Sequence, residues 1–322
     1  MRVVFLGTSE FAATILQRLA GSEGQRPVLV VSRPDRPRGR GRRPAAPPVA
    51  EAARALGIPL EQPENVNDEL ARARIVKSGA AVGVVCAFGA LIREPLLSER
   101  ELLNVHPSLL PRWRGAAPIE RAIMAGDERT GVSIMLLTAG LDSGPVCMTT
   151  TQPIGPGDTY GALADRLAQA GGGLLLEALD LRARGTPAPF SEQDAQGVTY
   201  AEKIGPEDRL LDPARPAAEL ERVVRALHPH IGARVALADG TLLGVHRAAL
   251  VAPVAPEASG ADRPGGPAAN AEPPPAGVSA RAGRLLLACR PGTLELLVVQ
   301  PPGGRAMDAA AYLRGHGPPG RR

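Results

Sequence analysis

The stretch Arg2-Val3-Val4-Phe5-Leu6-Gly7-Thr8-Ser9-Glu10-Phe11-Ala12, close to the start of the chain, decides the fold class. Residues 2–6 are β-forming and mostly apolar, and Gly7 ends the run in a turn. Ser9 is a typical helix N-cap, and from Phe11 onward apolar side chains recur at the spacing of an amphipathic helix. A buried strand that leads through a tight turn into a helix is the opening of a βαβ unit.

The alternation of short apolar runs and helical stretches continues through the first half of the chain. Continuous apolar runs are typical of strands that are buried on both faces. The further predicted strands are residues 28–31, 81–86, 102–105, 131–137 and 146–151, and the predicted helices are residues 49–56, 68–77 and 160–182. We therefore predict an α/β domain over residues 1–183, with a doubly wound, mostly parallel sheet of the Rossmann-like kind. Ligands of such domains bind at the carboxyl ends of the strands.

A smaller second domain is predicted after an irregular linker. We assign the linker to residues 184–208, the domain to residues 209–313 and a tail to residues 314–322. A helical stretch and several β-type runs predict a small barrel or sandwich. These are residues 213–227, followed by 234–238, 241–245, 284–288 and 293–299. Between residues 252 and 280, Pro, Ala and Gly dominate, so we expect a disordered insertion that cannot build a core of its own.

The composition is that of a globular protein. Of the 322 residues, 44% are hydrophobic, and no apolar run reaches the roughly 18 residues that would span a bilayer. The first residues show no export signal, so we expect a soluble, cytoplasmic protein. Cys86, Cys147 and Cys289 stand far apart in the sequence, which favours neither a disulfide framework nor a zinc site. We expect no metal.

The positive charge of the chain is concentrated in one predicted loop. Residues 33–43 contain six arginines and one aspartate, a local charge of +5, whereas the whole chain carries +4. Alternating prolines and glycines make the loop stiff and closely approachable, which suits contact with phosphate groups. The alternative is that the loop is only a solvated face of the protein.

The common nucleotide-binding and hydrolase motifs are missing from the sequence. Gly7 stands alone where a dinucleotide-binding motif needs three glycines, so we reject NAD binding. A P-loop, a zinc-protease H-E-x-x-H pair and an esterase G-x-S-x-G elbow are also absent. The chemistry must therefore be sought in other residues.

The sharpest local signal is an amide and an imidazole near the end of one predicted strand. Asn104 and His106 are two positions apart, so in a strand they point to the same side of the sheet. Pro107 and Pro111 then stop regular structure and hold a rigid loop directly behind the histidine. The alternative is that Asn104 caps the strand end and His106 is an ordinary satisfied histidine.

Asp142 lies in a glycine-flanked loop between two predicted strands, 36 residues after His106. If the two were paired, the carboxylate would orient the imidazole and stabilise its positive charge. An amide, an imidazole and a carboxylate suffice for acyl transfer without a covalent intermediate. The alternative is that Asp142 is a turn residue.

Five blocks of the sequence together resemble the methionyl-tRNA formyltransferases, a family of the folate-dependent formyltransferase superfamily. The blocks follow the family's order and span most of the chain. They are residues 5–12, 33–41, 104–118, 140–144 and 199–204. By this resemblance the first domain binds 10-formyltetrahydrofolate, and the second is a barrel of the OB type that helps to hold tRNA. Asn104, His106 and Asp142 match the family's catalytic residues.

The resemblance also implies two binding regions. The folate site would be formed by Phe88, Gly89, Ala90, Leu91, Ile92, Ser108, Leu109, Leu110, Pro111 and Leu141. The tRNA would be bound by Arg36, Arg38, Arg40, Arg42 and Arg43, with Arg40 at the position of the family's key arginine. Two features depart from the family pattern: the insertion is unusually long, and residues 227–232 read Leu-His-Pro-His-Ile-Gly where an Asn-Pro-Trp type of sequence is usual.

The implied function is transfer of the formyl group of 10-formyltetrahydrofolate, a co-substrate, to the α-amine of methionyl initiator tRNA for translation initiation. We expect a monomer that binds both substrates and no membrane. One alternative is another folate-dependent N-formyltransferase, or a formyl-folate hydrolase, that acts on a nucleotide sugar or a purine precursor. The other is a noncatalytic RNA-binding protein. The basic loop and the second domain favour a tRNA over a small acceptor, and the three candidate catalytic residues favour an enzyme.

Overall fold

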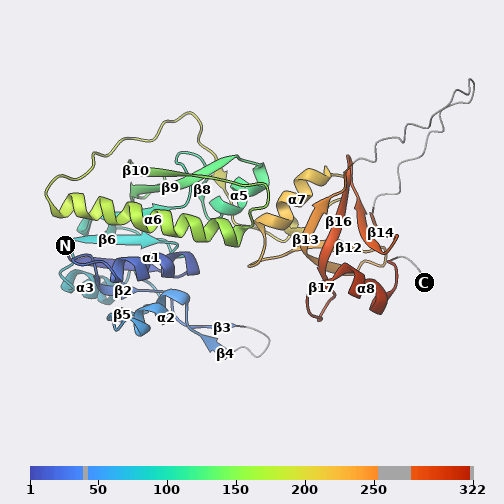
Figure 1. The fold of residues 1–322 in the computed structure, drawn as a ribbon. Helices are drawn as coiled ribbons and strands as arrows, with labels where there is room; N and C mark the ends of the chain where they lie inside the picture. Colours follow the sequence, from blue (N-terminus) through green and yellow to red (C-terminus); the bar gives the residue numbers. More distant parts are fainter. Residues whose placement is uncertain (39–42, 253–276, 320–322) are drawn as a thin grey trace, which may run out of the picture. The chain divides into compact units, whose positions relative to one another are not determined.

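The computed structural model describes residues 1–38, 43–252 and 277–319 and consists of two compact units (Figure 1). The first unit comprises Met1–Ala122, Asp127–Pro156 and Ala162–Lys203, and the second comprises Ile123–Gly126, Gly157–Gly161 and Ile204–Arg322. After two short excursions, the chain passes from the first unit to the second for the last time between Lys203 and Ile204. No helix in the described residues is long and apolar enough to cross a membrane.

The first unit is built on a seven-stranded, mostly parallel sheet, which confirms the predicted fold class. In sheet order the strands are β10 (Val146–Pro153), β9 (Arg129–Leu136), β7 (Leu102–His106), β6 (Val82–Cys86), β1 (Val3–Gly7), β2 (Pro27–Val31) and β5 (Leu60–Glu61). The strands β7, β6, β1, β2 and β5 run parallel, whereas β9 is antiparallel to both of its neighbours. Every residue of β1, β6 and β7 is buried, as their apolar runs predict.

Helices cover both faces of this sheet (Figure 1). They are α1 (Glu10–Ala20), α2 (Pro48–Ala55), α3 (Glu69–Lys77), α4 (Leu96–Glu99), α5 (Pro118–Ala125) and α6 (Tyr160–Ala183). The predicted N-cap of α1 is confirmed, because the Ser9 hydroxyl accepts a hydrogen bond of 3.3 Å from Ala12 N. On one face of the sheet, Ile75 of α3 and Leu96 of α4 share a core with alternate residues of β1 and β2.

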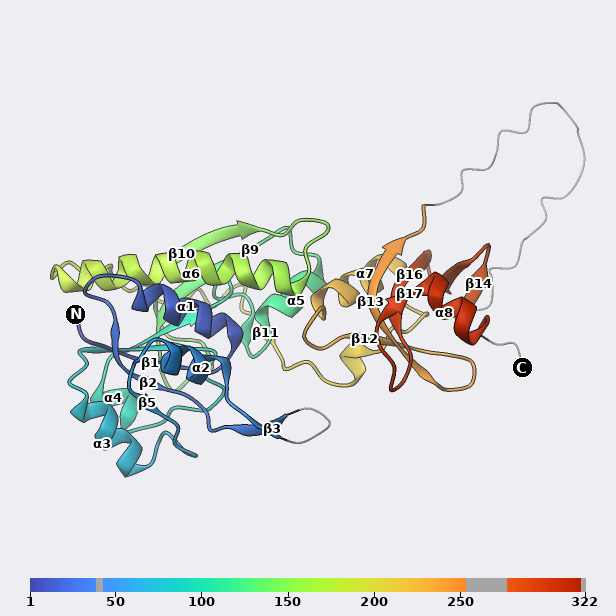
Figure 2. The ribbon, with the colours of Figure 1, turned by 60° about the horizontal axis from the view of Figure 1, so that its bottom comes forward.

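The long helix α6 packs closely against both the sheet and α1, and the two helices run alongside each other in Figures 1 and 2. Glycines make this approach possible. A Cβ added to Gly171 would lie 3.1 Å from Val132 Cγ1, and one added to Gly172 would lie 2.7 Å from Arg18 Cδ. Because Gly171 also approaches Val105, this side chain of β7 faces α6. The glycine run therefore sets the distance between α6 and its neighbours.

The second unit contains a six-stranded antiparallel sheet. Its strands are β12 (Ala233–Ala236), β13 (Leu242–Leu250), β16 (Thr293–Gln300), β15 (Arg284–Ala288) and β14 (Gly277–Arg281) in sheet order, with β17 (Met307–Asp308) paired to β16. The first and last strands of this order, β12 and β14, come into contact, so the sheet curls into the small barrel-like form that was predicted. A short helical turn η1 (Glu207–Arg209) and the helices α7 (Ala217–Ala226) and α8 (Ala309–His316) complete the unit.

Two sequence predictions about the second unit need correction. The predicted disordered insertion over residues 252–280 extends too far, because Gly277–Arg281 pairs with β15 as strand β14. Residues 253–276 lie outside the described part of the chain. The predicted tail also begins too early, since α8 continues to His316. Both errors arise where alanine and glycine dominate, because backbone hydrogen bonds there carry structure that apolar periodicity does not reveal.

Two small ladders stand apart from the main sheets. Strands β3 (Arg36–Arg38) and β4 (Arg43–Ala45) form an antiparallel hairpin that leaves the first unit after β2. The parallel pair β8 (Arg114–Gly115) and β11 (Tyr200–Ala201) joins the loop after β7 to the segment that follows α6. Neither pair has the length or the apolar pattern by which strands are predicted.

Candidate active site

The polar side chains predicted at the end of β7 share one face of the sheet. Asn104 is 8% exposed and His106 is 4% exposed. Leu102, two positions earlier, belongs to the core on the α3 and α4 face, whereas Val105 faces α6. The alternation along the strand therefore places Asn104 and His106 together on the side opposite α6.

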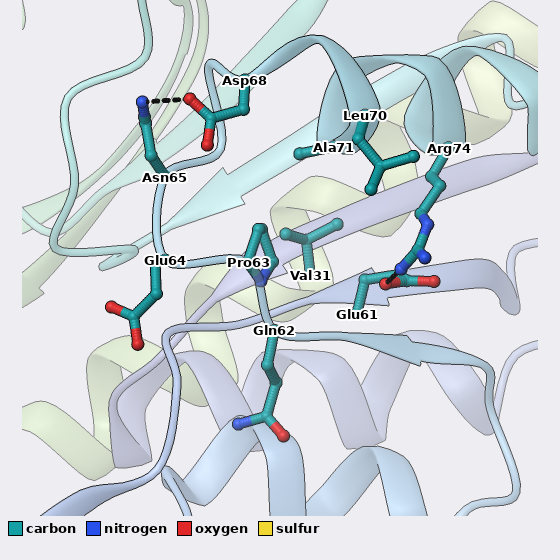
Figure 3. Close-up of a pocket in the computed structure, with 10 residues that line it drawn as sticks. All are labelled: Val31, Glu61, Gln62, Pro63, Glu64, Asn65, Asp68, Leu70, Ala71 and Arg74. Atoms are coloured by element: carbon teal, nitrogen blue, oxygen red, sulfur yellow. Dashed lines mark hydrogen bonds and ion pairs between the residues drawn. The ribbon is translucent and has the colours of Figure 1, made fainter.

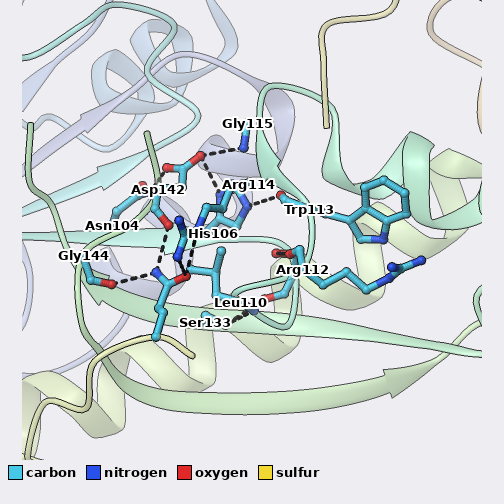
Figure 4. Close-up of polar contacts among 12 residues, drawn as sticks. Asn104, His106, Leu110, Arg112, Trp113, Arg114, Gly115, Ser133, Asp142 and Gly144 are labelled. Carbon is cyan, nitrogen blue, oxygen red and sulfur yellow. Dashed lines mark hydrogen bonds and ion pairs between the residues drawn. The ribbon is translucent and has the colours of Figure 1, made fainter. Parts of the chain in front are cut away.

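Asp142 meets both of these residues from the loop between β9 and β10 (Figure 4). Asn104 Nδ2 donates to Asp142 Oδ1 at 3.3 Å, and Gly115 N donates to Asp142 Oδ2 at 2.8 Å. His106 Nδ1 lies 3.7 Å from the same Oδ2, within ion-pair distance but beyond a direct hydrogen bond. The structure thus brings the three predicted residues together, although they are 38 positions apart in sequence at the widest.

Both ring nitrogens of His106 face oxygen atoms. Its Nε2 lies 2.9 Å from the carbonyl oxygen of Trp113, which can only accept a hydrogen bond. Its Nδ1 faces the carboxylate of Asp142 at 3.7 Å. The ring is therefore held between a main-chain carbonyl on one side and a carboxylate on the other.

The loop that follows β7 is held by buried hydroxyl groups. Ser108 Oγ donates to the carbonyl of Arg112 at 2.6 Å. Ser133 Oγ, on the neighbouring strand β9, donates to the carbonyl of Ser108 at 2.8 Å and accepts from Leu110 N at 3.2 Å. Both serines are fully buried, so these hydrogen bonds are formed away from competing water.

The far end of the same loop is anchored by Asp127. Its carboxylate accepts two hydrogen bonds from Arg112, at 2.9 and 2.6 Å, and one of 2.8 Å from Trp113 Nε1. The Arg112 guanidinium also lies 4.3 Å from the centre of the Trp113 ring, and the carboxylate raises the pKa of this arginine. Trp113 has a φ of 62°, so these contacts hold a left-handed backbone that presents its carbonyl to His106.

The Asp142 loop is also held in an uncommon conformation. Asp142 has a φ of 44°, and a Cβ on Gly144 would collide with the carbonyl oxygen of Leu136. Gln193 Nε2 donates to the carbonyls of Asp142 and Gly144, at 2.8 and 2.7 Å. The loop is therefore fixed through its main chain as well as through the Asp142 carboxylate.

Residues predicted for the folate site lie after β6 and β7, at adjacent strand ends. Phe88 and Ile92 are buried in the core, so their side chains are not available to a ligand. Between them, Gly89 has open space around its Cα, and Leu91 is 62% exposed. Ser108 is buried, Leu109, Leu110 and Pro111 are half-buried, Ala90 is half-buried, and Leu141 is 61% exposed.

Three of the predicted tRNA-binding arginines belong to the β3–β4 hairpin. Arg36 is exposed and forms an ion pair of 2.7 Å with Glu64, and the backbones of Arg38 and Arg43 pair across the hairpin. Arg40 and Arg42 lie outside the described residues. The strands β2, which precedes the hairpin, and β7, which carries Asn104, are parallel and three strand spacings apart, about 14 Å.

A cavity of about 260 Å³ lies at the edge of the sheet next to this hairpin (Figure 3). It is lined by Val31, Glu61, Gln62, Pro63, Glu64, Asn65, Asp68, Leu70, Ala71 and Arg74. Several of these residues anchor the chain before the hairpin: Gln62 Nε2 donates to the carbonyl of Arg33 at 2.9 Å and to Asp35 Oδ1 at 2.8 Å. The cavity contains none of the three candidate catalytic residues.

Cysteine chemistry finds little support near the site. Cys86, at the end of β6, is fully buried, and burial raises the pKa of its thiol, so it is not a poised nucleophile. Among the residues that the structure describes, no group of three or more His, Cys, Asp or Glu side chains is arranged to hold a metal ion.

Several residues that hydrogen-bond the loops of the candidate site were not predicted from the sequence. Asp127, Ser133 and Gln193 were assigned no role, and Thr199, whose Oγ1 accepts from Trp113 N at 2.9 Å, was noted only within a block of resemblance. A hydrogen bond between distant loops leaves no periodic pattern in a sequence. The Thr199 block was the one available signal.

Two family models together match almost the whole chain. The model described as "Formyl transferase" matches residues 1–179, and the model described as "Formyl transferase, C-terminal domain" matches residues 203–317. The two matches meet near the boundary between the compact units.

Curated relatives of the same length share about two fifths of their residues with the chain. A methionyl-tRNA formyltransferase of Paracoccus denitrificans is 40% identical over 100% of this chain and 99% of its own length. One of Thiobacillus denitrificans is 43% identical over 98% of this chain and 96% of its own length.

Solved structures with lower identity share the fold. An N-formyltransferase from Helicobacter canadensis, in complex with folinic acid and dTDP-3-aminofucose, is 12% identical with a TM-score of 0.63, and the match covers 91% of this chain and 98% of that one. HypX from Aquifex aeolicus, in complex with tetrahydrofolic acid, is 18% identical with a TM-score of 0.60, over 97% of this chain and 47% of that one.

Proposed function

The chain belongs to the formyl transferase family, and from this premise we propose that it formylates methionyl initiator tRNA, with 10-formyltetrahydrofolate as the formyl donor. The observation that carries the proposal is the similarity to methionyl-tRNA formyltransferases over the full chain, which includes the second domain. The alternative acceptors, a nucleotide sugar or a purine precursor, are less well supported, because the neighbour solved with a dTDP-sugar is only 12% identical.

Residues at the end of β7 fit a formyl donor. Asn104 Nδ2 carries two hydrogens and makes one long hydrogen bond, of 3.3 Å, within the described residues. One N–H is therefore free to reach an acceptor such as a formyl oxygen. The exposed Leu91 and Leu141, from the loops after β6 and β9, supply apolar surface for a ring, and Gly89 lets a ligand approach the main chain.

The reaction forms one C–N bond and breaks another. The methionine α-amine attacks the formyl carbon, the bond from that carbon to the folate nitrogen breaks, and a proton moves from the amine to that nitrogen. Negative charge develops on the formyl oxygen as the amine attacks. Asn104 Nδ2 and His106 Nδ1, which makes no direct hydrogen bond to Asp142, donate to this oxygen, and each such donor is worth roughly 3 kcal/mol in the transition state.

Asp142 orients these donors and handles the proton. Its two carboxylate oxygens are shared among Asn104, His106 and Gly115 N, so the negative charge lies beside the imidazole without a direct hydrogen bond. The 3.7 Å gap to His106 Nδ1 leaves room for transfer through a hydrogen-bonded water. The carboxylate thereby takes up the proton that the amine releases, and this proton then passes to the folate nitrogen as the C–N bond breaks.

The β3–β4 hairpin contacts the acceptor end of the tRNA. The hairpin strands contain Arg36, Arg38 and Arg43, and in the sequence Arg40 and Arg42 stand between them. Cationic side chains on a short stiff hairpin bind phosphates and position the aminoacyl end against the folate. We further propose that the enzyme works as a cytoplasmic monomer.

The function is tested by single-turnover formylation with purified protein and 10-formyltetrahydrofolate. Parallel reactions offer methionyl initiator tRNA, a dTDP-linked amino sugar, a purine-precursor amine, or no acceptor. We expect N-formylmethionyl-tRNA and negligible product in the other three. Formylation of a small acceptor in place of tRNA, or hydrolysis without an acceptor, would overturn the proposal.

The role of the hairpin is tested by the salt dependence of tRNA binding. Each phosphate contact that is lost lowers the slope of log affinity against log salt by about one. We expect this change in Arg40→Ala, with a raised KM for tRNA and unchanged folate binding. Arg184→Ala, an exposed arginine just beyond α6, is the matched control. If the slope of log affinity against log salt were the same in Arg40→Ala and in the wild type, the hairpin would be a solvated surface that does not bind the tRNA.

A further inference from the structure

Gln193 is joined to the candidate active site by every polar atom of its side chain. Its Nε2 donates to the carbonyl of Asp142 at 2.8 Å and to that of Gly144 at 2.7 Å. Its Oε1 accepts from Arg114 Nε at 3.0 Å and from Arg114 Nη2 at 2.8 Å. An amide group has two donor hydrogens and one acceptor oxygen, so the hydrogen-bonding capacity of Gln193 is fully used.

These contacts close a ring around Asp142. Gln193 holds the main chain of Asp142 and the side chain of Arg114. The next residue, Gly115, donates its N–H to the Asp142 carboxylate at 2.8 Å. Gln193 thus holds Asp142 by its carbonyl, and Gly115 holds it by its carboxylate. The Asp142 loop, the loop after β7 and the segment after α6 meet at this point.

The Asp142 loop is held by hydrogen bonds more than by packing. Asp142 has a φ of 44°, a left-handed conformation that is uncommon for residues other than glycine. The preceding residues Ala139, Gly140 and Leu141 are exposed, so packing does not hold them. The hydrogen bonds to the carbonyls of Asp142 and Gly144 on either side of Ser143 define the course of the loop.

We propose that Gln193 is a positioning residue for catalysis, which holds the Asp142 carboxylate at His106 without touching either substrate. The inference rests on the proposed function for its kinetic consequence. It gives the segment after α6 a role in the reaction, although that segment has the irregular sequence of a linker. Loss of this support displaces the carboxylate, and a displacement of about 1 Å at a reacting group costs up to ~100-fold in rate.

The first test is the kinetics of Gln193→Ala. We expect kcat to fall by roughly 10- to 100-fold, while the KM values for folate and tRNA change less than about threefold. Gln196→Ala is the matched control, since it is the same residue type three positions later and is exposed. Gln193→Glu keeps the acceptor for Arg114 but places an oxygen against two carbonyls, so it should be at least as slow. Gln193→Met, of similar size, replaces the alanine variant if that variant does not fold.

A double-mutant cycle separates positioning from a general loss of structure. If Gln193 acts through Asp142, then Gln193→Ala should cost less than about threefold when Asp142 is already replaced by Asn. If the two residues acted independently, the fold-decrease in kcat of the double variant would equal the product of the fold-decreases of the two single variants. A normal kcat in both Gln193→Ala and Gln193→Met, or multiplicative effects in the cycle, would overturn the proposal.

Amide hydrogen exchange gives a readout that does not depend on the reaction. The peptide that spans residues 138–145 should exchange faster in Gln193→Ala than in the wild type, and Gln196→Ala should leave it unchanged. Unchanged exchange in Gln193→Ala would also overturn the proposal. If the wild type does not formylate methionyl-tRNA, the proposed function is wrong. Faster exchange in Gln193→Ala would then still show that Gln193 stabilises the Asp142 loop.

Discussion

The two compact units differ most in what they bury. All of the buried polar or charged residues in the described part of the chain belong to the first unit: Gln25, Ser32, Asn104, His106, Ser108, Glu120, Thr130 and Ser133. The described core of the second unit is formed by aliphatic side chains and Tyr312. Burying a polar group costs about 1–3 kcal/mol unless it is hydrogen-bonded, and the side chains of Asn104, His106, Ser108 and Ser133 are all hydrogen-bonded.

The position of these polar residues is more informative than their number. Four of them, Asn104, His106, Ser108 and Ser133, gather where β7 ends and β9 passes beside it. No comparable cluster of buried polar residues occurs in the described part of the second unit. The first unit therefore combines an apolar core with a polar candidate site, whereas the described core of the second unit is apolar.

The largest expected effect is at the reacting groups of the first unit. His106→Ala or Asn104→Ala should lower kcat by about 100- to 1000-fold, because each removes a donor to the developing oxyanion. Asp142→Asn should be at least as slow, since an amide neither stabilises the imidazolium nor accepts a proton. Quenched-flow formylation measures the rates, and circular dichroism checks the fold. The exposed His316→Ala in the second unit is the control, and a near-normal rate in any of the three would remove the assigned chemistry.

A core substitution in the second unit should affect stability and spare the chemistry. Leu296 on β16 is fully buried, so Leu296→Ala should destabilise the protein by about 2–5 kcal/mol. At temperatures well below unfolding, kcat should stay within about twofold of the wild type. Urea unfolding and single-turnover rates on the same sample measure both quantities. A fall in kcat as large as that of His106→Ala would show that the cores of the two units are not functionally distinct.

Ser133→Ala should have a smaller, mixed effect. It leaves Leu110 N and the carbonyl of Ser108 without their buried partner, which costs about 1–3 kcal/mol. Because this loop presents the Trp113 carbonyl to His106, kcat should also fall, by roughly 10-fold. Ser133→Thr keeps the hydroxyl and serves as the paired variant. Loss of stability with full activity would mean that the loop is structural only.

The smallest expected effect is the pH dependence of stability in the second unit. Burial lowers the pKa of His228, and the nearby His246 and His230 lower it further. The folded protein therefore binds this proton less tightly than the unfolded chain, so its stability falls as the pH drops below about 6.5, down to the lowered pKa. His228→Gln should reduce the loss of urea midpoint between pH 8 and pH 5.5. An equal loss in the wild type and in His228→Gln would contradict this assignment.

The two units also differ in how burial runs along their strands, and this difference explains how much of the fold could be predicted from the sequence. Strands β1, β6 and β7 are buried on both faces and appear in the sequence as unbroken apolar runs. In the second unit burial alternates along β12 and β15, which gave weaker but usable signals. The two-residue strands β8 and β11 carry no such pattern, because two residues cannot display a period.

The candidate site was predictable where it follows from strand geometry. The shared face of Asn104 and His106 follows from their spacing, and the structure places Asp142 beside both. The supporting contacts were not predictable, because Gln193 and Asp127 act from loops whose approach is decided by tertiary structure. Their catalytic roles stay predictions until the variants are measured.

The three consecutive glycines of α6 have a consequence for the order in which the first unit folds. Each glycine in a helix interior costs about 1 kcal/mol relative to alanine, so Gly171, Gly172 and Gly173 weaken α6 as an isolated helix. The same residues let it settle against Val132, Val105 and Arg18. A helix that is poor in solution and well fitted to its sheet depends on tertiary packing for its stability. We therefore expect α6 to form only after β7 and β9, which carry the candidate site, have paired.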